Sequence, residues 1–141
     1  MDEKLKVIIS AEVSKLQQGV EKAKQAVKGL QGDHPDYFKT YACAKHFAVH
    51  SGPEWNRHSY NASVSARDLR ETYLPAFKAL IDEANVKQVM CAYNAYEGEP
   101  CCGSSKLMLE ILRDEWGYEG MVVSDCWGIN DFGGCTADKF L

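Results

Sequence analysis

The feature that most constrains this chain is the regular alternation of helical patterns with short apolar runs. Three segments carry apolar residues that step by three and four positions, as one face of a helix requires: 11–30, 65–84 and 105–116. A short apolar run follows each of them in turn, at 41–46, 87–93 and 121–125. The order helix, strand, helix, strand, helix, strand predicts βαβ units, and therefore a parallel sheet with flanking helices.

About three parallel strands fit either an open doubly wound sheet or one part of a (β/α)₈ TIM-type barrel, and the pattern alone leaves both open. A complete barrel of this kind needs roughly 200 residues or more, whereas the chain has 141. We therefore expect an α/β fold in a single domain over residues 1–141, which is an incomplete domain if the fold is a barrel.

Local signals indicate where the elements begin and break. Ser65 and Asp68 have the form of a capping box at the start of the second helix. Pro75 is expected to kink or split that helix, because proline cannot donate the backbone hydrogen bond that a helix interior needs. Segments 51–64 and 94–104 are predicted to be loops.

Composition and charge exclude several classes of function. The chain has 16 Lys and Arg against 20 Asp and Glu, a net charge of -4, and no long run of like charges, which disfavours nucleic-acid binding. No stretch approaches the roughly 18 apolar residues that a membrane helix requires. We expect neither a nucleic-acid partner nor a membrane partner.

Cysteine spacing gives one structural expectation. The six cysteines include no Cys-x-x-Cys pair, so a structural zinc site has little support and no metal or other cofactor is expected. Cys91 lies in a predicted strand, and Cys101 and Cys102 lie in the loop that returns from it. We expect these three thiols to lie close together, near enough for one disulfide.

All three predicted strands end in polar residues. Lys45 and His46 end the first run, Tyr93 and Asn94 follow the second, and Asp125 ends the third. In parallel α/β folds the active site forms at the carboxyl ends of the strands. A cation, an imidazole, a phenol and a carboxylate are therefore predicted to converge there, which suits binding of a hydroxylated substrate with acid, base or nucleophilic chemistry.

Each of these residues also has a purely structural interpretation. An Asp at a strand end is commonly a helix cap or a turn residue, and Lys45 and His46 can be an ion-pair partner and a half-buried histidine. Tyr93 can simply pack. The coincidence of three strand ends, rather than any one residue, favours the functional interpretation.

Three motifs, taken together, resemble glycoside hydrolase family 3. They are Ala44-Lys45-His46-Phe47, Met90-Cys91-Ala92-Tyr93-Asn94 and Val122-Val123-Ser124-Asp125, in the same order and at similar spacing as in that family. The stretch 45–61 is similar to its β-glucosidase and β-xylosidase branch. The resemblance covers about 20–132, while 1–18 and 133–141 match poorly.

The resemblance implies a fold, a reaction and site residues. The fold implied is the later part of the N-terminal (β/α)₈ barrel, and the reaction is retaining hydrolysis of terminal β-linked glucose or xylose through a covalent glycosyl-Asp intermediate. Asp125 matches the family's nucleophile, Lys45 and His46 match its sugar-binding pair, and Tyr93 matches the tyrosine beside the nucleophile. The implied partner is an oligosaccharide or aryl β-glycoside substrate, and the intact protein is expected to be periplasmic or secreted.

Two expectations follow from what this chain lacks relative to the family. The acid/base of multi-domain members lies in a later C-terminal domain of the same chain, so the 141 residues are expected to be inactive alone. Glu54 is the carboxylate to test as a local acid/base, and its place in a predicted loop disfavours it. The competing function is a carbohydrate-binding α/β module that uses Lys45, His46 and Asp125 without catalysis.

Overall fold

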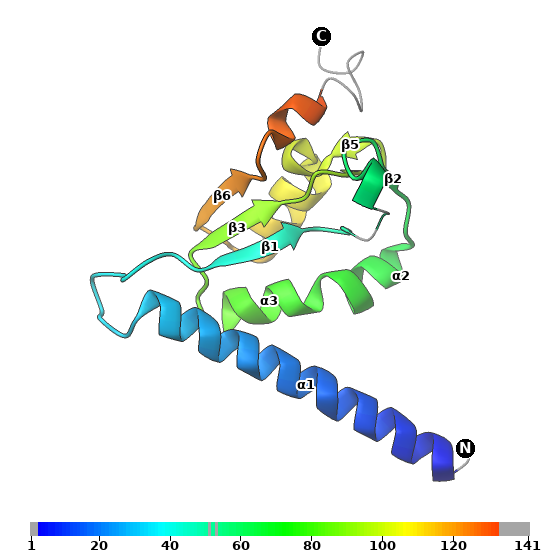
Figure 1. Ribbon diagram of the computed structural model, residues 1–141, viewed down its shortest axis with the longest axis vertical. Coiled ribbons are helices and arrows are strands. Elements are labelled where there is room, and N and C mark those ends of the chain that lie inside the picture. Colours follow the sequence, from blue (N-terminus) through cyan, green and yellow to red (C-terminus); the bar gives the residue numbers. More distant parts are fainter. Residues whose placement is uncertain (1–2, 51, 53, 133–141) are drawn as a thin grey trace.

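The computed structural model describes residues 3–50, 52 and 54–132. A three-stranded sheet stands beside a layer of helices, and the long first helix lies against that layer on its far side (Figure 1). No helix within the described residues is long and apolar enough to cross a membrane.

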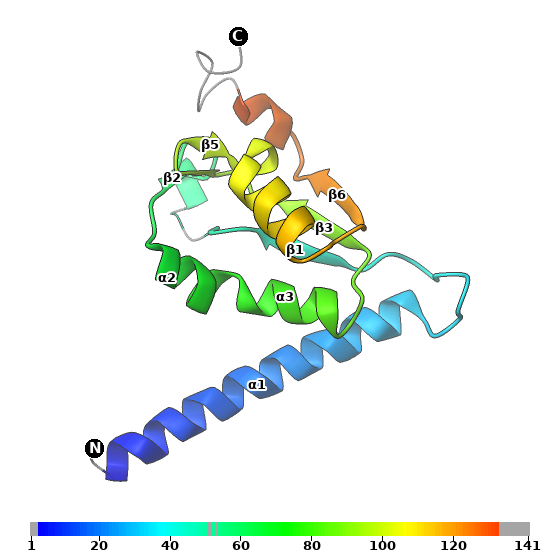
Figure 2. The same ribbon diagram turned by 180° about the vertical axis from the view of Figure 1, so that it is seen from behind.

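The central sheet is parallel and its strand order follows the chain. Strands β1 (Cys43–Phe47) and β6 (Met121–Ser124) pair on either side of β3 (Gln88–Cys91). The helices that connect these strands, α3 (Pro75–Asp82) and η4 (Ser105–Glu115), both lie on one face of the sheet (Figure 2). Helices on one face and strands in sequential order fit a section of a barrel rather than a doubly wound sheet, which has helices on both faces. The predicted partial barrel is confirmed.

The hydrophobic core lies between the sheet and these helices. Ala44, Val89 and Val122 are aligned across the three strands and pack in this core. Phe47 at the end of β1 is fully buried, and its ring makes edge contacts with Phe77 of α3 at 5.1 Å and with Trp116 at 5.8 Å. The end of β1, where the predicted site begins, is thus anchored by the core.

The first helix differs from its prediction in extent and in burial. Helix α1 runs over Glu3–Gln31, eight residues further toward the N-terminus than the periodic pattern indicated. Of its predicted apolar stripe Val27 is buried, but Leu16 is 69% exposed and Leu30 is 54% exposed. The helix is therefore amphipathic in sequence, yet among the described side chains of its apolar stripe Val27 is the one that is buried.

The second helical region is divided, as Pro75 predicted. It consists of α2 (Ala66–Asp68), the π-helical turn η2 (Leu69–Tyr73) and α3, which begins at Pro75. The Ser65 side chain accepts a hydrogen bond from the backbone N–H of Asp68 at 3.1 Å, which confirms the predicted N-cap.

The two segments predicted as loops contain a second small sheet. Strand β2 (Asn61–Ala62) pairs in parallel with β4 (Ala95–Tyr96), which turns back into β5 (Glu99–Pro100). Short helical turns, η1 (Glu54–Asn56) and η3 (Cys101–Gly103), complete these segments. The hairpin turn places Glu97 at φ 52° and Gly98 at φ 88°, the positive values that a two-residue type I′ turn requires. Describing both segments as loops was therefore wrong in part.

The expected cysteine cluster forms. Cys91, the last residue of β3, is bonded to Cys102 in η3, with the two Cα atoms 5.2 Å apart. The sulfur of Cys101 lies 3.4 Å from the carbonyl oxygen of Ala48. The disulfide fixes the loop after β3 to the strand end from which Tyr93 emerges.

Candidate active site at the carboxyl ends of the strands

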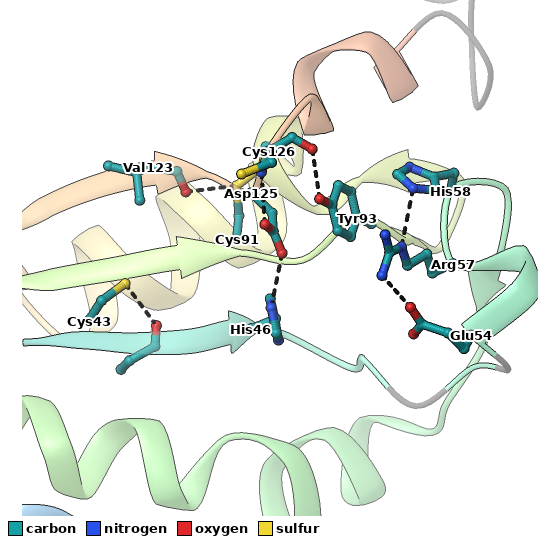
Figure 3. Close-up of polar contacts among 12 residues, drawn as sticks. Cys43, His46, Glu54, Arg57, His58, Cys91, Tyr93, Val123, Asp125 and Cys126 are labelled. Carbon is teal, nitrogen blue, oxygen red and sulfur yellow. Dashed lines mark hydrogen bonds and ion pairs between the residues drawn. A yellow bond between two sulfur atoms is a disulfide. The ribbon is translucent and has the colours of Figure 1, made fainter.

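Three of the four predicted site residues meet above the carboxyl edge of the central sheet. His46 belongs to β1, Tyr93 comes two residues after β3, and Asp125 directly follows β6. The Nε2 atom of His46 lies 2.9 Å from Oδ2 of Asp125 (Figure 3). Because the three strands are parallel neighbours, their ends deliver these side chains to one place.

The carboxylate of Asp125 is held from several sides. Its side chain is 13% exposed, and its Oδ1 accepts a hydrogen bond from the backbone N–H of Cys126 at 2.7 Å. Burial raises the pKa of this carboxyl, but the Cys126 N–H, the Tyr93 hydroxyl, the His46 imidazole and the charge of Lys45 outweigh burial and lower the pKa below its usual value of 3.8. Asp125 is therefore ionised at neutral pH.

The hydroxyl of Tyr93 lies between two acceptors. It donates to the carbonyl oxygen of Cys126 at 2.7 Å, and the Asp125 carboxylate lies near enough to affect its pKa. Burial, followed by the charge of Asp125, raises the pKa of Tyr93, so the phenol keeps its proton. Its single proton is donated to the Cys126 carbonyl, and the N–H of the same residue donates to Asp125.

His46 is a neutral donor in this arrangement. Burial lowers its pKa, and the neighbouring His50 and Lys45 lower it further, which outweighs the opposing effect of Asp125. The ring of His50 lies 4.7 Å from that of His46. A neutral imidazole with its proton on Nε2 donates to Oδ2 of Asp125 and leaves Nδ1 as an acceptor.

Lys45 is placed differently from the other three residues. It is exposed and, together with His46, His50 and Phe77, lines a cavity of about 260 Å³ that does not include Asp125. Among the described residues it makes no hydrogen bond or ion pair, although its charge still lowers the pKa of Asp125. The structure thus brings His46, Tyr93 and Asp125 into contact and leaves Lys45 beside them.

A second cluster, which the sequence analysis did not identify, surrounds the ring of Tyr93. The ring of His58 lies 4.3 Å from it and the guanidinium of Arg57 lies 4.9 Å from it. Nδ1 of His58 in turn lies 2.8 Å from Oδ2 of Asp131, in the turn η5 (Gly128–Asp131). Arg57 and His58 lie within the stretch 45–61 that carried the family resemblance, which is the signal that singles them out.

The other acidic candidate, Glu54, is occupied elsewhere. Its carboxylate is paired with Arg57 (Figure 3), and its side chain is 75% exposed. Within the residues that the structure describes, no group of three or more His, Cys, Asp or Glu side chains is arranged to hold a metal ion. The chemistry available here is that of one ionised, hydrogen-bonded carboxylate with neutral donors around it.

Comparisons with known sequences assign the chain to a family. The model of the glycosyl hydrolase family 3 N-terminal domain matches residues 14–138, a wider span than the motifs alone indicated. A xylan 1,4-beta-xylosidase of Xylanibacter ruminicola is 59% identical over 110 residues, which are 77% of this chain and 13% of that protein. A probable beta-D-xylosidase 7 of Arabidopsis thaliana is 41% identical over 110 residues, which are 71% of this chain and 14% of that protein.

Solved structures agree with this placement. A family 3 exo-beta-xylosidase bound to a xylobiose aziridine probe superposes with a TM-score of 0.73 at 31% identity, over 78% of this chain and 15% of that one. A beta-glucosidase from Listeria innocua superposes with a TM-score of 0.68 at 32% identity, over 78% and 16%. The chain spans only 13–14% of the length of the two curated relatives named above. The chain belongs to glycosyl hydrolase family 3 and corresponds to part of the N-terminal domain of that family.

Proposed function

We propose that this chain carries the nucleophile and part of the sugar subsite of a retaining β-glycosidase that releases terminal xylose or glucose. The observation that supports this most directly is the ionised carboxylate of Asp125, which accepts hydrogen bonds at the carboxyl edge of the sheet. The family and the names of the relatives support the substrate class.

In the proposed first step, a carboxylate oxygen of Asp125 attacks the anomeric carbon of the sugar. The bond between that carbon and the leaving oxygen breaks, and an acid elsewhere in the protein protonates the leaving oxygen. Water then attacks the glycosyl-Asp ester, gives up a proton to the same acid/base, and restores the carboxylate. The low pKa of Asp125 keeps the attacking oxygen charged without the need for a base.

The neighbouring residues have distinct proposed roles. His46 and the N–H of Cys126 hold the two oxygens of Asp125 in a fixed orientation, which limits the motion needed to reach the attack geometry. Lys45 is exposed beside His46 and offers a cation with three donors to sugar hydroxyls. Tyr93 donates to the carbonyl oxygen of Cys126 and so steadies the residue whose N–H holds Asp125.

We further propose that the acid/base lies outside the described residues. A retaining mechanism needs a second carboxyl group about 5 Å from the nucleophile. Glu54 is paired with Arg57 and Asp131 with His58, so each of these carboxylates already has a structural partner. General acid catalysis typically contributes about 10²–10⁴ in rate. The 141-residue chain is therefore expected to bind glycosides without measurable turnover.

The test uses both the chain and a chimera. In the chimera, the 110 aligned residues of this chain replace the matching segment of the 59% identical Xylanibacter ruminicola enzyme. The chimera should hydrolyse aryl β-xylosides or β-glucosides, and a 2-fluoro glycoside should leave a covalent adduct that mass spectrometry locates on Asp125. Asp125→Ala should abolish both turnover and adduct, whereas Asp114→Ala, which removes an exposed carboxylate on η4, should change neither.

Three outcomes contradict parts of the proposal. An adduct on another residue, or an Asp125→Ala chimera that keeps more than a few per cent of its rate, shows that the nucleophile is misassigned. Turnover by the 141-residue chain alone shows that the acid/base lies within it. Glycoside binding by a chimera that is folded but inactive and forms no adduct favours the competing function, a non-catalytic carbohydrate-binding module.

A further inference from the structure

We propose that His58, oriented by Asp131, is a positioning residue that holds the ring of Tyr93 and so keeps the Tyr93 hydroxyl beside the nucleophile. The proposal rests on the proposed function of Asp125, because it concerns the geometry around that carboxylate. It assigns a role to a pair of side chains that lie outside the strand-end motifs.

The first argument is the packing around Tyr93. This residue lies beyond the last residue of β3, so the strand itself does not fix its ring. The ring of His58 contacts it at 4.3 Å with the planes inclined by 54°. On the η5 side, a Cβ built on Gly128 would lie 3.6 Å from the Tyr93 ring, so the backbone of that turn also packs against it. Tyr93 is only 7% exposed as a result.

The second argument is that both nitrogens of His58 are engaged. Nδ1 donates to Oδ2 of Asp131 at 2.8 Å, while Nε2 accepts from Nε of Arg57 at 3.2 Å. These two contacts require the tautomer with its proton on Nδ1 and fix the plane of the ring. An imidazole with both nitrogens occupied has no free site for proton transfer to a substrate, so its contribution lies in orientation.

The third argument is the path of the contacts. Asp131 belongs to the segment that follows β6, as does Asp125, whereas His58 belongs to the segment that follows β1. The Tyr93 hydroxyl is bonded to the carbonyl of Cys126, which directly follows Asp125; the Tyr93 ring contacts His58, and His58 is bonded to Asp131. These contacts therefore connect all three strand ends. The Asp131 side chain is 13% exposed and that of His58 is 48% exposed, so Asp131 is the buried partner of the pair.

The experiment measures catalysis by the chimera with His58 and Tyr93 changed singly and together. The Tyr93 hydroxyl supports Cys126, whose N–H donates to the charged Asp125. A hydrogen bond to a charged group corresponds to about 10- to 100-fold, so Tyr93→Phe should lower kcat by about tenfold. His58→Ala should lower kcat by about tenfold with little change in KM. It should also shift the acid limb of the pH profile of kcat/KM to higher pH, as Tyr93→Phe should. In the Tyr93→Phe background, His58→Ala should cost less than about twofold, because no hydroxyl remains to be positioned.

Conservative and control variants complete the design. Asp131→Asn keeps an acceptor oxygen for Nδ1 of His58 and should retain most of the rate, whereas Asp131→Ala should behave like His58→Ala. Circular dichroism melting identifies any variant that fails to fold, in which case the comparison of the two Asp131 variants decides. His34→Ala, which removes an exposed histidine in the α1 to β1 connection, should have no effect.

The possible results separate this inference from the function on which it rests. Where Asp125→Ala still abolishes turnover, three results would overturn the positioning role of His58. They are an equal loss of kcat from His58→Ala in both backgrounds, an effect confined to KM, and no effect at all. If Asp125→Ala is active, the assignment of the nucleophile fails first, and the role of His58 fails with it.

Discussion

Phe47 links the stability of the domain to the position of the candidate site. It is fully buried at the end of β1, directly after His46, and its ring makes edge contacts with Phe77 and Trp116. We predict that Phe47→Ala lowers the free energy of unfolding substantially. The substitution leaves a cavity between the sheet and both connecting helices. This cavity cannot close unless the sheet and the two helices move.

The expected magnitude follows from the burial and the ring contacts. Phe→Ala in a core costs about 3–5 kcal/mol, and each aromatic pair contributes about 0.5–1.5 kcal/mol beyond the area buried. With two such pairs lost, about 4–5 kcal/mol is expected. That is a large share of the roughly 5–15 kcal/mol by which domains of this size are stable.

The assay is urea unfolding followed by circular dichroism at 25 °C. The matched control is Trp55→Ala, which removes a larger aromatic side chain that is 85% exposed and should change stability by no more than about 0.5 kcal/mol. If Phe47→Ala leaves too little folded protein, Phe47→Leu should show a smaller loss of the same sign. A loss below about 2 kcal/mol for Phe47→Ala, or a similar loss for Trp55→Ala, would refute the view that the core anchors the end of β1.

Three further predictions follow from the site and its supports. Asp125 has a folded pKa below 3.8, so its stabilising effect is present above that pH and is lost as the pH falls through the folded value. Tyr93→Phe should raise this pKa, which a ¹³C titration of the carboxyl group would detect. An unchanged titration would contradict an influence of the hydroxyl on Asp125. Cys102→Ser breaks the disulfide to Cys91, which closes a loop with a sequence separation of 11, and should cost about 2–4 kcal/mol in urea unfolding, with a negligible change counting against the bond. Ser104→Ala removes the N-cap of η4 and should lower the melting midpoint by an amount equivalent to about 1 kcal/mol; a Ser104→Thr variant that behaved the same would argue against capping as the cause.

The main elements of the fold were predictable because their signals are local. The three central strands begin and end within about two residues of the apolar runs, and Pro75 marks the start of α3 as expected. The small sheet was missed because β2, β4 and β5 have two residues each, too few to show any periodicity. Its turn was also inconspicuous, since Glu97 occupies a left-handed position where Asn, Asp or Gly is usual.

The site was predictable only in part, for a geometric reason. Lys45 and His46 were both placed at the site because they end the same apolar run. Successive residues of a strand point to opposite faces, and the structure directs only His46 to Asp125. The pairing of β1 with β3 also shifts in register between Lys45 and Phe47, which surrounds His46. The cluster of His58 and Asp131 depends on contacts across 73 positions of sequence, which no local pattern reveals.

The contact between His46 and Asp125 spans two strands that do not touch each other. Both β1 and β6 pair with β3, and neighbouring strands lie about 4.8 Å apart, so the outer two are separated by about 10 Å in a flat sheet. The side chains meet at 2.9 Å above the end of β3. Their separation therefore depends on the spacing and twist of all three strands. A remote change that alters how β1 and β6 sit against β3 therefore changes the distance between imidazole and carboxylate without touching either residue.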